Sequence, residues 1–221
     1  PGIATSCSMP LFWSSRTRMA DKPFAAAAAR NAAPILDVLR RELRDSSAVL
    51  EIGSGTGQHA ATFAAELSHL QWQTSDLDEN HPGIRAWVDD AQLDNLHAPL
   101  SLDVRTARPE AVSVDAIFSA NTAHIMDIDA VEAMFALAGA ALPPGGVFCL
   151  YGPFRIQGAF NTASNEQFDA GLRNRGQGMG IRDIETLDDF GARSGLVRER
   201  LYAVPSNNYV ATWRRATDDG A

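Results

Sequence analysis

The 221-residue sequence is poor in lysine, cysteine and long apolar runs. Lys22 is its only lysine, so a mechanism that needs a buried lysine as base or Schiff-base former has almost no candidate. The two cysteines, Cys7 and Cys149, are too few for a disulfide framework or a cysteine-rich metal site, and they fit a reducing cytoplasm. No run reaches the roughly 18 apolar residues of a membrane helix, so we expect no membrane partner.

The charge balance is acidic, with 27 Asp and Glu against 19 Lys and Arg and a net charge of −8. This charge opposes nonspecific binding to nucleic acid, which we therefore do not expect as a partner. Hydrophobic residues make up 45% of the chain, which is enough for one sizeable core. We expect a disordered leader or tag over residues 1–20, one domain over 21–215 and a tail over 216–221. No feature indicates an oligomeric state.

Helix and strand patterns alternate along the domain, as is typical of a parallel sheet covered by helices. An arm inserted at 152–182 holds one expected helix, starting at Asn165 with Ser164 as its cap. Two strands joined by a short link then end the domain, and such a pair must be antiparallel. The sequence therefore predicts an α/β fold with a seven-stranded, mostly parallel sheet and one antiparallel strand. Expected strands cover 48–52, 70–75, 98–102, 114–119, 147–151, 196–204 and 209–214, and expected helices cover 35–45, 58–67, 84–91, 128–142 and 184–193.

The sharpest local signal is the sequence EIGSGTG at residues 51–57, between an expected strand and an expected helix. Glycines at such a junction permit positive φ angles and let the backbone approach a ligand closely. The spacing is G-x-G-x-G, whereas a dinucleotide fingerprint needs its third glycine where this chain has Gln58. Spacing alone also allows a tight connection without a ligand.

Acidic residues follow the second and third expected strands. Asp76 lies 19 residues beyond Gly57, where a carboxylate can accept hydrogen bonds from both hydroxyls of a ribose. Asp78 is the weaker candidate for this role. Asp103 follows the third strand, and its alternative is a solvated carboxylate at a strand end.

These motifs, followed in order by the turn Leu142-Pro143-Pro144-Gly145-Gly146, resemble those of the class I methyltransferases that use S-adenosylmethionine (SAM). Further segments over residues 22–215, among them Arg30-Asn31, Gly57-Gln58-His59 and Tyr151-Gly152-Pro153-Phe154, resemble the methyltransferase-like 26 family, long known as a domain of unknown function. The resemblance implies a three-layer Rossmann-like fold, SAM as cofactor, and an adenine contact at Asp103. The implied cofactor-binding residues are Arg30, Glu51, Gly53, Ser54, Gly55, Gly57, His59, Asp76, Leu77, Asp103, Val104 and Asn121.

Methyl transfer from a sulfonium depends on alignment and water exclusion, and it requires no fixed catalytic residue. His124, after the fourth expected strand, is the candidate general base, with a structural histidine as the alternative. Tyr151 is the second catalytic candidate, with a place in the pocket wall as its alternative. The candidate substrate-binding residues of the arm are Phe154, Arg155, Asn165 and Arg182, although these side chains could simply pack.

We expect a methyltransferase that acts on a small-molecule acceptor without a metal ion. One alternative is a noncatalytic SAM-binding subunit of a larger assembly. Another is methylation of RNA or protein, which the charge balance disfavours. An NAD oxidoreductase fits least, since the chain lacks both the glycine spacing and a catalytic tyrosine–lysine pair.

Overall fold

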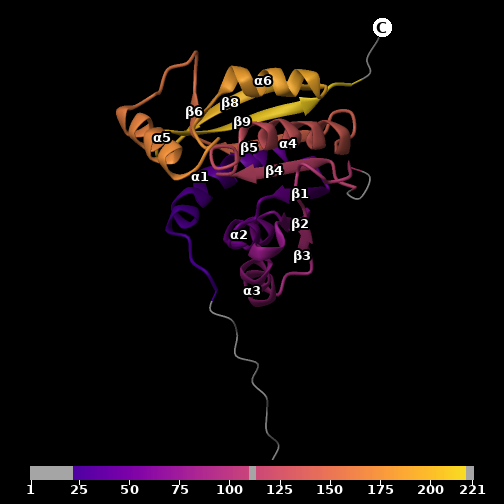
Figure 1. Cartoon of the computed structure of the whole chain (residues 1–221). Helices are drawn as coiled ribbons and strands as arrows, with labels where there is room; N and C mark the ends of the chain where they lie inside the picture. The colour runs from indigo at the N-terminus through magenta and orange to yellow at the C-terminus, as the bar shows by residue number, and fades with distance from the viewer. Residues whose placement is uncertain (1–21, 110–112, 218–221) are drawn as a thin grey trace, which may run out of the picture.

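The structure is a computed structural model that describes residues 22–109 and 113–217. Its centre is a seven-stranded sheet with the order β3-β2-β1-β4-β5-β9-β8 (Figure 1). All neighbours from β3 to β5 are parallel, and β9 runs antiparallel to both β5 and β8. This arrangement confirms the predicted mostly parallel sheet with one antiparallel strand. The strands are β1 (Ala48–Ile52), β2 (Gln71–Asp76), β3 (Leu96–Ser101), β4 (Ala116–Ala120), β5 (Val147–Gly152), β8 (Leu196–Val204) and β9 (Asn208–Arg215).

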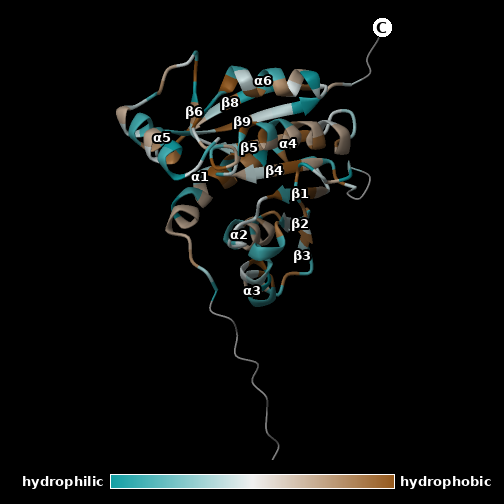
Figure 2. Cartoon of the chain, viewed as in Figure 1, coloured by the Kyte–Doolittle hydropathy of each residue, from teal (hydrophilic) through white to brown (hydrophobic). Residues whose placement is uncertain are grey.

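Helices cover both faces of the sheet. One face carries α1 (Ala26–Glu42), α2 (Gln58–Glu66) and α3 (His81–Ala91), and the other carries α4 (Ile128–Ala141) and α6 (Ile184–Arg193). These helices mix hydrophilic and hydrophobic residues, as expected when one side of a helix packs on a sheet (Figure 2). Within the described residues, no helix combines the length and the apolar character needed to cross a membrane.

Successive side chains of the central strands contribute to two separate cores. In β1, Leu50 and Ile52 pack with α4 and α6, whereas Val49 packs with α1 and α2. The largest side chains in the two cores, Trp213 and Trp72, are fully buried. All residues of β5 are buried, as expected for a central strand covered on both faces. The two cores hold the carboxyl edge of the parallel strands in place.

Between β5 and α6, the chain leaves the sheet and forms β6 (Phe154–Arg155), α5 (Ala163–Arg175) and β7 (Arg182–Asp183). The short parallel pair of β6 and β7 joins the two ends of this segment. The predicted cap of its helix is wrong. Thr162 has extended backbone angles and its Oγ1 accepts a hydrogen bond from Asn165 N at 3.3 Å, so the helix starts earlier and Ser164 lies in its first turn.

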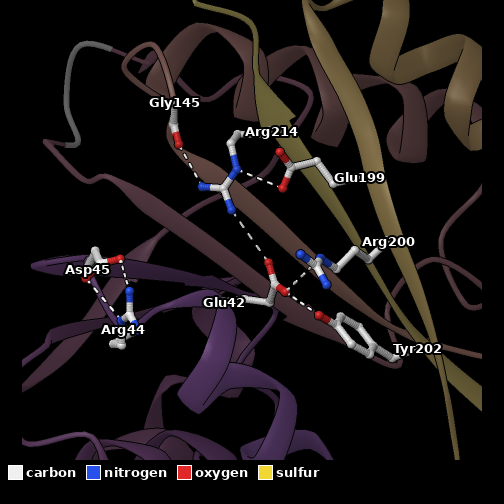
Figure 3. Close-up of polar contacts among 8 residues, drawn as sticks. All are labelled: Glu42, Arg44, Asp45, Gly145, Glu199, Arg200, Tyr202 and Arg214. Atoms are coloured by element: carbon white, nitrogen blue, oxygen red, sulfur yellow. Dashed lines mark hydrogen bonds and ion pairs between the residues drawn. The ribbon is translucent and has the colours of Figure 1, made fainter.

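A buried carboxylate joins the end of α1 to the β8–β9 pair (Figure 3). The Glu42 side chain is 6% exposed, and it accepts a hydrogen bond from the Tyr202 hydroxyl. Arg200 Nε and Arg214 Nη2 lie 3.7 and 3.6 Å from its two oxygens, and Arg214 Nε also donates to Glu199 at 2.8 Å. Because a buried charge is costly without partners, these contacts hold the end of α1 against the antiparallel strands.

Candidate functional site

A cavity of about 580 Å³ opens at the carboxyl edge of the parallel strands. Open α/β sheets bind ligands at this edge, where the loops that follow neighbouring strands meet. The volume lies within the range of about 300–1,000 Å³ that small-molecule sites occupy. The wall comes from the ends of β1 to β4, the start of α1, the segment that leads into α4, and Gln177.

The glycine turn after β1 forms part of this wall, and its three glycines have φ angles of +72° (Gly53), +57° (Gly55) and +86° (Gly57). A Cβ at Gly53 would lie 2.6 Å from Thr122 Cγ2, and one at Gly57 would lie 2.9 Å from Ile84 Cα. A Cβ at Gly55 would meet no protein atom within 4 Å. Packing within the protein therefore requires glycine at Gly53 and Gly57, whereas Gly55 lines the cavity and has open space around the position of a Cβ atom.

Glu51 lies beneath the turn and does not line the cavity. Its Oε2 accepts hydrogen bonds from Ser54 Oγ at 2.9 Å and Trp72 Nε1 at 3.2 Å. Burial raises the pKa of Glu51 to about 7, and the negative charge of Asp76 adds to the shift, while the two hydrogen bonds oppose it. Glu51 therefore supports the turn from below and takes up a proton near neutral pH.

The raised pKa of Glu51 predicts a specific pH dependence of stability. The folded protein binds the proton of the Glu51 carboxyl group more tightly than the unfolded chain does. The contribution of this protonation to stability is therefore complete below about pH 4.5 and is lost as the pH rises through about 7. Replacing Glu51 with glutamine removes the titration and keeps an oxygen acceptor. We expect the variant to gain stability relative to the wild type between pH 5 and pH 8, by up to roughly 3 kcal/mol.

Thermal or urea unfolding at several pH values measures this difference. Glu79→Gln, at an exposed position of the 3₁₀ turn η1 (Asp78–Asn80), is the matched control and should show no such trend. If the free energies of unfolding of Glu51→Gln and wild type differ by a constant amount across this pH range, the raised pKa of Glu51 is ruled out.

Asp76, at the end of β2, has its carboxylate in the cavity wall. Its Oδ2 accepts a hydrogen bond from Gly55 N at 2.7 Å, and its Oδ1 accepts from Leu77 N and Asn80 Nδ2, both at 2.8 Å. These bonds orient the carboxylate and tie it to the glycine turn. Since an ionised carboxylate has about four acceptor positions, capacity for a ligand remains.

Most of the predicted cofactor-binding residues meet in this one cavity. Asp103 follows β3, where its Oδ1 accepts a hydrogen bond from Arg105 N at 3.0 Å. His59 Nε2 lies 2.7 Å from Asn31 Oδ1, which connects α2 with α1. The predicted residues that line the cavity are Gly53, Ser54, Gly55, His59, Asp76, Leu77, Asp103, Val104 and Asn121. Glu51 and Gly57 do not line the cavity, and Arg30 lies exposed on α1 outside the wall.

The two predicted catalytic side chains do not line the cavity. His124 is buried and its ring lies edge-on to that of Phe168, with centroids 5.4 Å apart. Burial lowers the pKa of His124 to about 4, and the charges of Arg182 and Arg175 contribute. Tyr151 is also buried; its hydroxyl accepts a hydrogen bond from Asn208 Nδ2 at 2.9 Å, and burial raises its pKa.

The predicted substrate-binding side chains also lie outside the wall and hold the inserted segment together. Phe154 is buried against the ring of Tyr209. Arg155 pairs with Asp183, and Asn165 donates hydrogen bonds to Asn161 Oδ1 and to the Asn207 carbonyl. Arg182 donates to the main-chain carbonyls of Ala123, Met126 and Gly178.

Sequence reasoning missed a part of the wall that comes from α1 and from the segment before α4. Asp127 caps α4 by accepting a hydrogen bond from Ala130 N at 2.9 Å, and it pairs with Arg105. An aspartate directly before an expected helix is a capping signal that could have drawn attention to it. The alanines at the start of α1 that line the cavity carry no comparable signal in the sequence. The missed wall residues include Ala25, Ala27, Ala28, Arg105, Ile125, Met126, Asp127 and Gln177.

No group of three or more His, Cys, Asp or Glu side chains in the described residues is arranged to hold a metal ion. The absence of a metal requirement stays a prediction.

A family model described as "Protein of unknown function (DUF938)" matches residues 22–215. The chain belongs to the DUF938 family. The match covers β1 to β9 and every residue that lines the cavity, so the cavity is part of the DUF938 domain.

Solved methyltransferase structures share the fold of this DUF938 chain. An O-methyltransferase family protein from Burkholderia thailandensis matches with a TM-score of 0.76 at 15% identity, over 87% of this chain and 58% of its own. Mitomycin 7-O-methyltransferase MmcR matches with a TM-score of 0.75 at 18% identity, over 86% of this chain and 56% of its own. Human N-acetylserotonin methyltransferase, solved in complex with SAM, matches with a TM-score of 0.71 at 12% identity, over 86% of this chain and 53% of its own.

The fold is therefore the Rossmann-like class I methyltransferase fold, as predicted. The chain spans a little over half the length of these proteins. At such low identity the likeness concerns the fold alone.

Proposed function

We propose that this DUF938 protein is a SAM-dependent methyltransferase that acts on a small molecule, and that it belongs with the methyltransferase-like 26 family. One observation carries the proposal: the oriented Asp76 carboxylate and the open space at Gly55 lie in the wall of one cavity. A carboxylate can accept hydrogen bonds from both hydroxyls of a ribose. A glycine with open space beside it lets a ligand approach the main chain closely.

In this proposal, each part of SAM would meet a different group of the wall. The turn at 53–55 would lie against the methionyl part, Asp76 would accept hydrogen bonds from the ribose, and Asp103 would accept one from the adenine amino group. Leu77 and Val104, which line the cavity, would make apolar contacts with the adenine ring. Bound SAM would supply an activated methyl group, and the protein would align the acceptor and exclude water.

A small acceptor is favoured over RNA or protein by the size of the cavity, about 580 Å³, and by the net charge of −8. A noncatalytic SAM-binding subunit would share the cofactor site, so only turnover distinguishes it from an enzyme.

Calorimetric titration with SAM, its demethylated product S-adenosylhomocysteine (SAH), and NAD tests the cofactor assignment. We expect SAM and SAH to bind and NAD to bind at least 10-fold more weakly, because the turn lacks the third glycine of the dinucleotide fingerprint. Incubation with methyl-labelled SAM and a metabolite extract then tests turnover. Absence of SAM binding would reject the proposal, and tight binding without any labelled product would favour the noncatalytic subunit.

A further inference from the structure

A second, smaller cavity of about 270 Å³ lies beside the first. Its wall comes from the last turn of α5, the loop at 176–179, the start of α4 and Arg182 in β7. Gln177 lines both cavities, and Arg182 donates to the carbonyl of Met126, which belongs to the wall of the first. Since small-molecule sites occupy roughly 300–1,000 Å³, the second cavity suits a small ion or a single chemical group.

Two guanidinium groups and no carboxylate line the second cavity. Nε and Nη2 of Arg173 donate to the Asp169 carboxylate at 2.6 and 3.4 Å. Nε and Nη2 of Arg182 donate to three main-chain carbonyls. Neither Nη1 atom donates to any residue that the structure describes. Both guanidinium groups are therefore held in place by the protein and keep donors for a ligand.

The positive charge at this cavity is only partly balanced. Arg182 forms no ion pair with a described residue, and burial together with the charge of Arg173 lowers its pKa. The two carboxylates that act on Arg182, Asp127 and Asp169, are already paired with Arg105 and Arg173. Because two guanidinium groups repel each other, an anion bound between Arg173 and Arg182 is favoured.

The loop at 176–179 adds main-chain donors to the same wall. The N–H groups of Gln177 and Gly178 donate to no residue within the described part of the chain, and both residues are exposed. Gly178 has a φ angle of +83°, and a Cβ there would lie 2.7 Å from Asp127 Cβ, so the loop packs closely on the residue before α4. Successive N–H groups in a turn are a common binding device for anions.

We propose that the second cavity binds a small oxyanion of the phosphate type, either as free phosphate or as the phosphate group of a larger ligand. The planar donors of arginine match the oxygens of phosphate, and main-chain N–H groups complete such a site. Phosphate also carries nearly two charges at neutral pH, which suits two guanidinium groups. The site is independent of the function proposed above, because neither Arg173 nor Arg182 lines the first cavity.

Equilibrium dialysis with labelled inorganic phosphate tests the site directly. Chloride keeps the ionic strength constant, so that all samples have the same screening. We expect saturable binding of one phosphate per chain. Acetate, which has one charge and two oxygens, should displace the labelled phosphate about 10-fold more weakly than unlabelled phosphate does.

A carboxylate introduced into the wall tests the location. Ile128→Glu should weaken phosphate binding about 10-fold by repulsion. Ile128 is the first residue of α4, where an acidic side chain favours the helix, so the variant should fold. Ile128→Gln has the same shape without the charge and should bind phosphate nearly as well as wild type. Ala136→Glu adds the same charge at an exposed position of α4 outside both cavities, and it should also have little effect.

Removal of one guanidinium group tests the donors. Arg173→Gln should weaken phosphate binding about 10-fold, since a bond from a charged donor is lost. Arg41→Gln is the matched control, because Arg41 is exposed on α1 and lines neither cavity. Asp169 loses its ion pair in Arg173→Gln, so thermal unfolding without phosphate shows whether this variant is folded.

Competition with two phosphate esters distinguishes the sources of the anion. If the anion belongs to a larger ligand that extends past Gln177, phenyl phosphate should displace labelled phosphate better than methyl phosphate or phosphate itself. The substitution Gln177→Ala should then change the affinity for phenyl phosphate and leave that for phosphate unchanged. If the anion is free phosphate, both esters should displace the label less well than phosphate does.

Three results would overturn the proposal. They are the absence of saturable phosphate binding, equal phosphate affinity of Ile128→Glu and Ile128→Gln, and displacement by acetate as strong as by phosphate. SAM binding is measured separately, so a failure of the phosphate site leaves the proposed methyltransferase standing, and a failure to bind SAM leaves the phosphate site standing.

Discussion

Replacing Asp76 with alanine is expected to weaken SAM binding about 100-fold, equivalent to about 3 kcal/mol. In the proposed binding mode this carboxylate accepts hydrogen bonds from both ribose hydroxyls, and bonds to an ionised acceptor are the stronger kind. The same substitution removes the acceptor of Gly55 N, so the glycine turn loses a contact that orients it. Calorimetric titration of the variant with SAM and SAH measures the loss.

Asp78→Ala is the matched control for this experiment. Asp78 lies two residues further along, its side chain is 79% exposed, and it does not line the cavity. SAM affinity should stay within about twofold of wild type, since a solvated charge at this position contributes little. Thermal unfolding without ligand shows whether each variant is folded. Equal losses in both variants, or no loss in Asp76→Ala, would refute the role of Asp76.

Replacing Gly55 with alanine is expected to weaken SAM binding about 30-fold, because in the proposed binding mode SAM lies against this turn and the new methyl group takes up space beside it. No protein atom lies within 4 Å of the added Cβ, so the folded protein itself has room for it. The φ angle of +57° adds strain of about 1–2 kcal/mol, which should lower the free energy of unfolding by a similar amount. The affinity for SAM and the free energy of unfolding can be measured on the same preparation.

Gly145→Ala separates ligand contact from backbone strain. Gly145 has a φ angle of +80° and also has no atom within 4 Å of a built Cβ, but it lies in the turn before β5, outside the cavity wall. The two variants should therefore lose similar stability, and only Gly55→Ala should lose SAM affinity. A comparable drop in affinity for both would mean that backbone strain, and not contact with the ligand, causes the loss at Gly55.

The sequence predicted the elements that local patterns specify. The strand at 48–52, the helix at 184–193 and the strand at 196–204 have the predicted bounds. The helix after the arm ends with Gly195 in the left-handed region, as a C-terminal glycine should. The start of α5 was misplaced, since Thr162 and Ser164 are both good capping residues and only the backbone angles of Thr162 decide between them.

The residues of the candidate site were likewise predicted only in part. Residues at strand ends, such as Asp76 and Asp103, were found because parallel strands must place their carboxyl ends along one edge. His124 and Tyr151 follow the same rule by position, yet neither lines the cavity. The side chain of His124 lies against Phe168, which is 44 residues away along the chain, and the hydroxyl of Tyr151 binds Asn208, which is 57 residues away.

Local patterns suffice to predict the main strands and helices along the chain, the glycine turn and the acids that follow it, because each of these depends on neighbours within a few residues or on the geometry of a parallel sheet. The set of groups that line the cavity could not be predicted in this way. The first turn of α1 forms an apolar wall, and Arg182 binds carbonyls 56 and 59 residues before it in the chain. Such contacts depend on how distant segments pack, and no local pattern of residues specifies that.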